Sequence, residues 1–252
     1  MIDHRNTIIV IPSRMASTRL PGKPLADICG LPMIVHVWRR AVESGVGQVL
    51  VAAAETRIAE AIREHGGDAI NTDPNLASGT DRIAQALSLR DPHGQFQYVV
   101  NVQGDLPTIE PLAIQRCLAG LVNDPVDIST IAAEIADPAD LANPNIVKAI
   151  TPLGALREVA YARDFVRLLP AGDPPPHWHH IGVYAFKRQA LGRFVSLPVS
   201  RLEAERKLEQ MRALENGMRI AVVRVDTVPL GVDTPADLEA ARRILKPHHA
   251  TV

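Results

Sequence analysis

The chain has 252 residues, and its 27 Lys plus Arg against 28 Asp plus Glu leave a formal net charge of -1. This balance argues against a nucleic-acid coat or a polybasic membrane anchor, because both bind polyanions through an excess of cations. Hydrophobic residues make up 46% of the chain and aromatic residues only 4%, so we expect an aliphatic core and no aromatic platform for single-stranded nucleic acid.

The first half of the chain alternates aliphatic runs with segments of helical spacing. The run at residues 7–11 is β-branched without polar alternation, which is typical of a strand covered on both faces of a parallel sheet. Strands alternating with helices indicate βαβ units, so we predict a three-layer α/β/α fold with a mostly parallel central sheet and a ligand site at its carboxyl edge. Further strands are expected at residues 49–52 and 98–102, and helices at residues 33–41, 58–64, 83–87 and 112–121.

The pattern changes between about residues 126 and 184. Aliphatic runs follow one another there without obvious crossover helices, so mixed or antiparallel strands are expected, as a substrate lid or a dimer ribbon. The expected elements are strands at residues 128–131, 146–150 and 181–184, a strongly charged helix at residues 200–214, a strand at residues 219–225, and a helix at residues 235–245 with Thr234 as its N-cap.

No internal repeat or low-complexity tract divides the chain. We therefore predict a single domain over residues 1–252, with residues from about 126 to 200 as a mixed-strand subregion and a frayed tail after Lys246. Cys29 and Cys117 lie far apart without a metal-ligand spacing, and no apolar run approaches the roughly 20 residues that span a bilayer. These features predict a reduced, soluble, cytoplasmic protein.

The loop after the first strand, residues 12–24, is the most conspicuous motif. It holds Arg14, Arg19 and Lys23 together with three hydroxyl side chains. At the carboxyl end of a strand, arginine forks, a lysine charge and backbone N–H groups can hold a polyphosphate, although a solvated basic loop is the alternative. The loop matches neither the GxxxxGK[ST] motif nor a GxGxxG motif after a strand, which disfavours a P-loop kinase and a nicotinamide dehydrogenase.

Two carboxylates stand where a metal could bind. Asp105 follows a predicted buried strand and a glycine, and Asp233 precedes the last predicted helix. Each has a structural alternative, because Asp is common in turns and at helix starts. If the two converge, they form an oxygen-rich site suited to Mg²⁺, which takes water and substrate phosphates as its other ligands. Their separation in sequence leaves that convergence open.

Two other polar segments give weaker signals. Residues 77–82 form a Ser/Gly turn that opens a helix, so their N–H groups either contact a ligand or only start the helix. His177, His179 and His180 resemble a metal cluster, but neighbours in an extended segment point to opposite faces and no fourth ligand is evident, which disfavours zinc. No GxSxG or HExxH motif indicates a covalent nucleophile or a zinc protease.

In their order along the chain, these motifs resemble those of the 3-deoxy-manno-octulosonate cytidylyltransferase family, also called CMP-KDO synthetases. The resemblance implies a Rossmann-like nucleotide-diphospho-sugar transferase fold with a mixed-strand dimerisation and substrate insertion. It also implies a homodimer, Mg²⁺ as cofactor, CTP and an eight-carbon 3-deoxy-ulosonic acid as substrates, and a role in lipopolysaccharide biosynthesis. It is carried by residues 11–14, 17–25, 32–37, 101–105, 143–145, 180–184, 208–212 and 231–235.

The same resemblance implies roles for individual residues. Arg19 and Lys23 would hold the CTP phosphates, while Asp105 and Asp233 would be the metal ligands, and these four would carry catalysis. The nucleotide-binding residues would be Pro12, Ser13, Arg14, Lys23, Ser78 and Gly79. The sugar-binding residues would be Gln103, His180, Tyr184, Glu209 and Gln210.

Three segments depart from the family pattern. Residues 52–55 stand in place of Ala-Thr-Asp, Leu76 in place of a His, and residues 161–164 in place of an aromatic-Ser/Thr-Arg-Ala stretch. These departures keep two other substrates open, the 8-amino analogue of the sugar and another ulosonic acid of the sialic type. A non-catalytic nucleotide-binding dimeric paralogue is a further alternative, whose expected mark is loss of Lys23 or of a metal carboxylate; both are retained.

Overall fold

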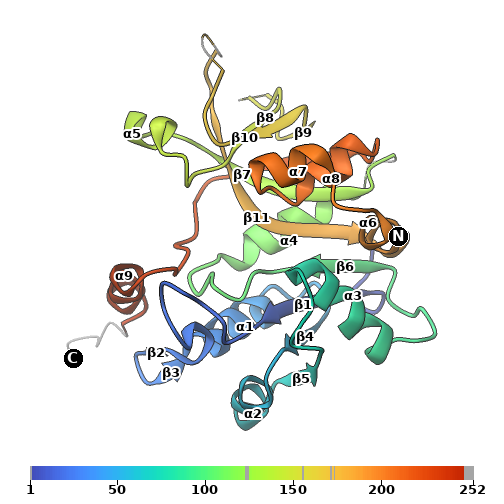
Figure 1. Cartoon of the computed structure of the whole chain (residues 1–252), viewed down its shortest axis with the longest axis vertical. Helices are drawn as coiled ribbons and strands as arrows, with labels where there is room; N and C mark the ends of the chain where they lie inside the picture. The colour runs from blue at the N-terminus through green and yellow to red at the C-terminus, as the bar shows by residue number, and fades with distance from the viewer. Residues whose placement is uncertain (1, 123–124, 155, 171, 173, 247–252) are drawn as a thin grey trace.

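Ten strands form one central sheet in the computed structural model (Figure 1), which describes residues 2–122, 125–154, 156–170, 172 and 174–246. The strands are β1 Thr7–Ser13, β4 Gln48–Ala53, β5 Asp68–Asn71, β6 Tyr98–Asn101, β7 Ile128–Glu134, β8 Lys148–Ile150, β9 Val159–Tyr161, β10 Asp164–Val166, β11 Trp178–Lys187 and β12 Ile220–Val225. Their order is β5-β4-β1-β6-β11-β7-β12-β9, with β8 paired to β11 and β10 paired to β8. A separate hairpin pairs β2 Asp27–Ile28 with β3 Leu31–Pro32.

Helices cover both faces of this sheet. Strand β1 shows why: Ile9 and Ile11 belong to one buried cluster, and Ile8 and Val10 to the other. The first cluster is closed by α1, α2 and α4, and the second by α3, α6 and α8. The three-layer prediction is therefore confirmed. The helices are α1 Met33–Glu43, α2 Thr56–Glu64, α3 Gly79–Arg90, α4 Pro111–Ala119, α5 Pro138–Ala142, α6 Arg188–Ser196, α7 Arg201–Arg206, α8 Gln210–Glu215 and α9 Pro235–Leu245, with a short 3-10 helix η1 at Lys23–Leu25.

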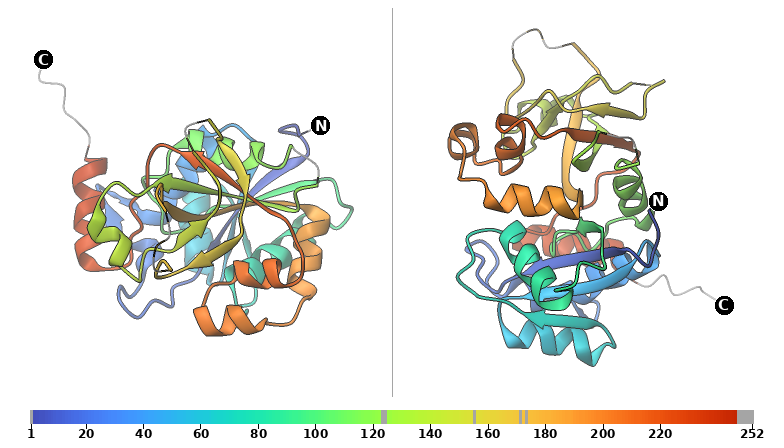
Figure 2. Two further views of the ribbon diagram at one scale, coloured as in Figure 1. Left: turned by 90° about the horizontal axis from the view of Figure 1, so that it is seen from above. Right: turned by 90° about the vertical axis from the view of Figure 1, so that its right-hand side faces the viewer.

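Strand direction explains the mixed part of the sheet. Strands β5, β4, β1 and β6 are parallel, β11 runs against both β6 and β7, and β12 is parallel to β7. Strand β11 is thus the reversed strand between two sets that share one direction, so the expectation of mixed strands is confirmed. The two sets of strands lie at opposite ends of the sheet. Helix α9 packs beside β2, near the set that contains β5, β4, β1 and β6 (Figure 2).

One helix prediction was wrong. The charged segment at residues 200–214 forms two helices, because α7 ends at Arg206 and Lys207 adopts a left-handed conformation with φ 54°. The break lets Leu208 and Met211 enter the core, and both are buried. Burial of these two side chains outweighs the helical tendency of the charged segment, which the pattern of charges alone does not reveal.

Several short elements were not predicted. Strand β5 has only two core positions between Asp68 and Asn71, and β9, β10, α5 and α6 lie in or beside the region without regular spacing. By contrast, Thr234 caps α9 as predicted, accepting a hydrogen bond from the Asp237 amide. The predicted fraying after Lys246 lies outside the described residues. In the part of the chain that the structure describes, helices are too short or too polar to cross a bilayer.

Candidate active site

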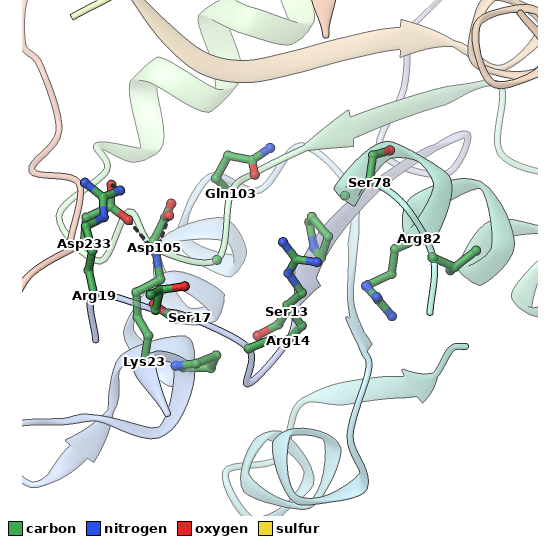
Figure 3. Close-up of a pocket in the computed structure, with 17 residues that line it drawn as sticks. Ser13, Arg14, Ser17, Arg19, Lys23, Ser78, Arg82, Gln103, Asp105 and Asp233 are labelled. Atoms are coloured by element: carbon green, nitrogen blue, oxygen red, sulfur yellow. Dashed lines mark hydrogen bonds and ion pairs between the residues drawn. The ribbon is translucent and has the colours of Figure 1, made fainter. Parts of the chain in front are cut away.

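A cavity of about 550 Å³ opens at the carboxyl ends of β1 and β6 (Figure 3). It brings together the end of β1, the basic loop, the Ser/Gly turn before α3, the loop after β6 and the residue preceding the α9 cap. All residues expected to bind nucleotide, carry catalysis or ligate a metal line it, together with Gln103 from the sugar set. They are Pro12, Ser13, Arg14, Arg19, Lys23, Ser78, Gly79, Gln103, Asp105 and Asp233.

Lys23 joins the two carboxylates that the sequence left unconnected. Its Nζ donates to Asp105 Oδ2 at 2.8 Å and to Asp233 Oδ1 at 3.0 Å, and Arg19 Nη2 lies 2.9 Å from Asp233 Oδ2. A backbone bond holds the two loops together, because the Val232 amide donates to the Asp105 carbonyl at 2.9 Å. Burial lowers the pKa of Lys23, but the charge and hydrogen bond of Asp105, followed by those of Asp233, outweigh it and leave the pKa raised.

The Asp233 side chain lines the cavity, and the helix that follows it is capped by other residues. Thr234 and Asp237 form a capping box, and Asp237 Oδ2 also accepts from the Asp233 amide at 3.1 Å. The helix does start where the structural alternative expected, at Pro235, but its capping contacts come from Thr234 and Asp237, so the Asp233 carboxylate is left to the cavity. The other alternative, a solvated basic loop, does not describe Lys23, whose side chain is 15% exposed, whereas Arg19 in the same loop is 63% exposed.

The donor set fits Mg²⁺. Asp105 and Asp233 offer carboxylate oxygens on one side of the cavity, and Lys23 already offsets their mutual repulsion. Within the described ranges no group of three His, Cys, Asp or Glu side chains is placed to hold a metal. An ion bound at the two aspartates would take its other ligands from water and substrate phosphates, which is the coordination Mg²⁺ favours.

Ser13 brings one unpaired polar atom to the wall of the large cavity. Ser13 is 6% exposed, and its Oγ has no hydrogen-bond partner. A buried hydroxyl without a partner is costly unless a ligand completes it. Gly104 allows the β6 loop to lie against β1, because a Cβ at this position would stand 2.9 Å from the Pro12 carbonyl oxygen.

Two residues were missed by sequence reasoning. Glu55 Oε2 accepts from the Met15 amide at 2.9 Å and so anchors the basic loop to the end of β4. Arg82 lines the cavity and donates to Thr72 Oγ1 at 2.6 Å. Its pKa is lowered, because burial and the nearby charge of Arg14 outweigh the opposing effect of Glu55. The available signals were the position of Glu55 after a strand and the position of Arg82 within the Ser/Gly segment.

Four of the expected sugar residues lie outside this cavity. Tyr184, Glu209 and Gln210 line a second, much smaller cavity, and the Tyr184 ring lies 5.5 Å from that of His180. Glu209 Oε1 and Gln210 Nε2 are buried without a hydrogen-bond partner, although Glu209 Oε1 lies 4.0 Å from Arg212 Nη2. The two regions touch through Thr80, which follows Gly79 and donates to Glu209 Oε2 at 2.6 Å.

The departures from the family pattern do not cluster at these sugar residues. Leu76 lines the large cavity beside the Ser/Gly turn. Tyr161 is exposed on β9 and pairs with Ala221 at the far end of the sheet. The departure at residues 52–55 ends at Glu55, whose carboxylate accepts a hydrogen bond from the basic loop.

Comparison with known proteins gives the same family. The cytidylyltransferase family model matches residues 8–220. The chain is 58% identical to the 3-deoxy-manno-octulosonate cytidylyltransferase of Parvibaculum lavamentivorans, over 94% of this chain and 92% of the relative. It is 56% identical to the enzyme of the same name from Rhodospirillum rubrum, over 94% of this chain and 95% of the relative.

A solved structure agrees with these sequence matches. The structure of a CMP:2-keto-3-deoxy-manno-octonic acid synthetase complexed with CTP superposes with a TM-score of 0.85 and 36% identity, covering 94% of this chain and 97% of the other. The chain therefore belongs to the 3-deoxy-manno-octulosonate cytidylyltransferase family.

Proposed function

We propose that this protein transfers CMP from CTP to the anomeric hydroxyl of 3-deoxy-D-manno-octulosonate (KDO), giving CMP-KDO and pyrophosphate. The observation that carries the proposal is the meeting of Lys23 and Arg19 with Asp105 and Asp233 at one edge of the sheet. Cations and a metal-binding pair side by side suit transfer of a nucleotidyl group. The product would serve lipopolysaccharide biosynthesis in the cytoplasm.

The large cavity is proposed to hold CTP. Ser13, with its unpaired buried hydroxyl, and Arg14 would contact the cytidine part beside Pro12, Ser78 and Gly79. Arg19 and Lys23 would hold the phosphates. During transfer the sugar oxygen forms a bond to the α-phosphorus as the bond to the pyrophosphate oxygen breaks, and the two cations would take up charge on the leaving pyrophosphate.

Asp105 and Asp233 are proposed to hold Mg²⁺. The ion, when bound, would supply charge neutralisation at the α-phosphate and a lower pKa for the attacking hydroxyl. Lys23 would keep both carboxylates in position before the ion arrives, since its ammonium bridges them. Little else is required of the protein chemically, because phosphoryl transfer depends mainly on positioning and electrostatic stabilisation.

The sugar is proposed to bind between the two cavities, against Gln103, His180, Tyr184, Glu209 and Gln210. Glu209 Oε1 and Gln210 Nε2, which are buried without a hydrogen-bond partner, support this, since one accepts and the other donates hydrogen bonds, as a polyhydroxy acid requires. We also propose one domain over the whole chain and a homodimer formed through the mixed-strand subregion. Exposed apolar side chains there, including Leu156, Tyr161 and Leu168, support that surface.

Replacing Glu55 by Leu is expected to raise the KM for CTP by about tenfold, because the Met15 amide loses its acceptor and the phosphate-binding loop loses its anchor. Glu55→Gln keeps an acceptor oxygen and should cause a smaller rise. Steady-state pyrophosphate release at saturating sugar measures both values. An unchanged KM in Glu55→Leu would show that the loop is held by other contacts.

Pyrophosphate release with CTP and Mg²⁺ tests the function directly. KDO, its 8-amino analogue and a sialic acid are compared in parallel, and KDO is expected to give the highest kcat/KM. A clear preference for either other acid would replace KDO as the substrate. A rise in melting temperature with CTP and Mg²⁺ but no turnover of any of these sugars would identify a non-catalytic nucleotide-binding protein.

A further inference from the structure

The hydroxyl of Thr130 lies inside the protein between β7 and the irregular part of β11. Thr130 is fully buried, and the pairing register of β11 shifts between Ile181 and Tyr184. Its Oγ1 lies 2.8 Å from the Val183 carbonyl oxygen, 3.2 Å from the Ile181 carbonyl oxygen and 3.0 Å from His180 Nε2. One hydroxyl thus contacts two carbonyl groups left by the strand irregularity and one histidine nitrogen.

The single proton of the Thr130 hydroxyl determines which ring nitrogen of His180 carries a proton. A threonine hydroxyl donates one hydrogen bond, and carbonyl oxygens only accept. The single Thr130 proton must therefore point to the carbonyl side, where the 2.8 Å contact with Val183 would otherwise join two acceptors. Oγ1 is then left with lone pairs toward His180, so Nε2 must carry a proton and donate.

The other ring nitrogen, Nδ1, is then the acceptor if the imidazole is neutral. Burial, followed by the nearby His179, lowers the pKa of His180 to about 3, which keeps the ring neutral near pH 7. Within the described residues Nδ1 makes no hydrogen bond, which leaves it able to accept one, and the His180 side chain is largely buried. The rings of Phe165 and Tyr184, at 4.8 and 5.5 Å between centroids, contact the imidazole and restrain its orientation.

We propose that Thr130 is a positioning residue that holds His180 in the Nε2–H tautomer, so that Nδ1 accepts a hydrogen bond from a hydroxyl of the sugar acid. The inference rests on the proposed function for the identity of the ligand, but the tautomer itself follows from the protein contacts. It also assigns chemistry to the site: the group facing Nδ1 must be a donor, such as a hydroxyl, and a carboxylate is excluded from that position.

Thr130→Val and Thr130→Ser test this inference as a pair. Valine keeps the side-chain shape without the hydroxyl, and serine restores the hydroxyl. Heteronuclear NMR of ¹⁵N- and ¹³C-labelled histidines in the ligand-free protein reports the tautomer, with the His180 signals assigned by their loss in His180→Gln. The wild type and Thr130→Ser should show the Nε2–H form, and Thr130→Val should show a mixture or the Nδ1–H form.

Kinetics separate positioning from folding. Thr130→Val should raise the KM for the sugar acid about tenfold, while the KM for CTP stays within about twofold and Thr130→Ser recovers most of the loss. An Nδ1–H tautomer in the wild type, an unchanged sugar KM in Thr130→Val, or an equal rise in both KM values would overturn the inference. A wild type that turns over no ulosonic acid contradicts the proposed function instead, and the NMR signals still decide the tautomer.

Discussion

Asp105→Asn is expected to lower kcat by about 10²- to 10³-fold, with a much smaller change in CTP affinity. The substitution keeps the shape of the side chain but removes one of the two negative charges that flank Lys23. The cavity would then offer Mg²⁺ the carboxylate of Asp233 alone, which would weaken the charge neutralisation that the ion would supply. CTP would still meet the basic loop and the Ser/Gly turn, which are separate from Asp105 in sequence.

Single-turnover pyrophosphate release and equilibrium binding of CTP measure these two quantities separately. Asp226→Asn is the matched control, because Asp226 is an exposed carboxylate paired with Arg116 and does not line the cavity. Its kcat should equal that of the wild type. Near-normal turnover in Asp105→Asn would remove Asp105 from the metal site and with it the main support for the mechanism.

Arg212→Met is expected to reduce the free energy of unfolding by about 3–5 kcal/mol, the largest stability loss anticipated here. Arg212 Nε donates to Glu203 Oε2 at 2.8 Å and its Nη2 to Glu203 Oε1 at 2.5 Å, and both side chains are buried. Its guanidinium also lies 4.8 Å from the centre of the Phe194 ring. Methionine fills similar space but leaves the Glu203 carboxylate buried without its cation.

Urea unfolding followed by circular dichroism measures the loss. Arg201→Met is the control, because Arg201 pairs with Glu205 at 2.9 Å on an exposed surface, where an ion pair contributes only about 0–1 kcal/mol. Arg212→Lys should fall between the two, since it keeps the charge but not the two-pronged geometry. A loss below about 1 kcal/mol in Arg212→Met would mean that the pair only balances its own desolvation cost.

The fold was predictable where the signal is local. The buried run of β1 and the capping residues of α9 are written in adjacent residues, so their types and approximate bounds followed from spacing alone. The break at Lys207 was not predictable in this way, because it depends on the core that Leu208 and Met211 enter. Strand β5 was not predicted for a similar reason: its apolar run is short, and its pairing with β4 stabilises it.

The residues of the candidate site were likewise predictable only where their signal is local. The basic loop, the Ser/Gly turn and the two aspartates stand out by residue type, and the family resemblance connects them. Glu55 did not stand out, because its role is to accept from a backbone amide of a distant loop. The sequence gives no signal for Thr130 either, because it is a β-branched residue like others in a buried strand.

The sequence by itself determined the alternation of strands and helices, the concentration of cations after the first strand and the family, because each is encoded by neighbouring residues or by their order. Only the tertiary structure decided that Asp105 and Asp233 meet at Lys23, and that the Thr130 hydroxyl contacts His180. Both results depend on contacts between segments far apart in the chain. Sheet order and the bond from the Val232 amide to the Asp105 carbonyl bring the aspartates together, and the irregularity of β11 brings its carbonyls and His180 to one hydroxyl.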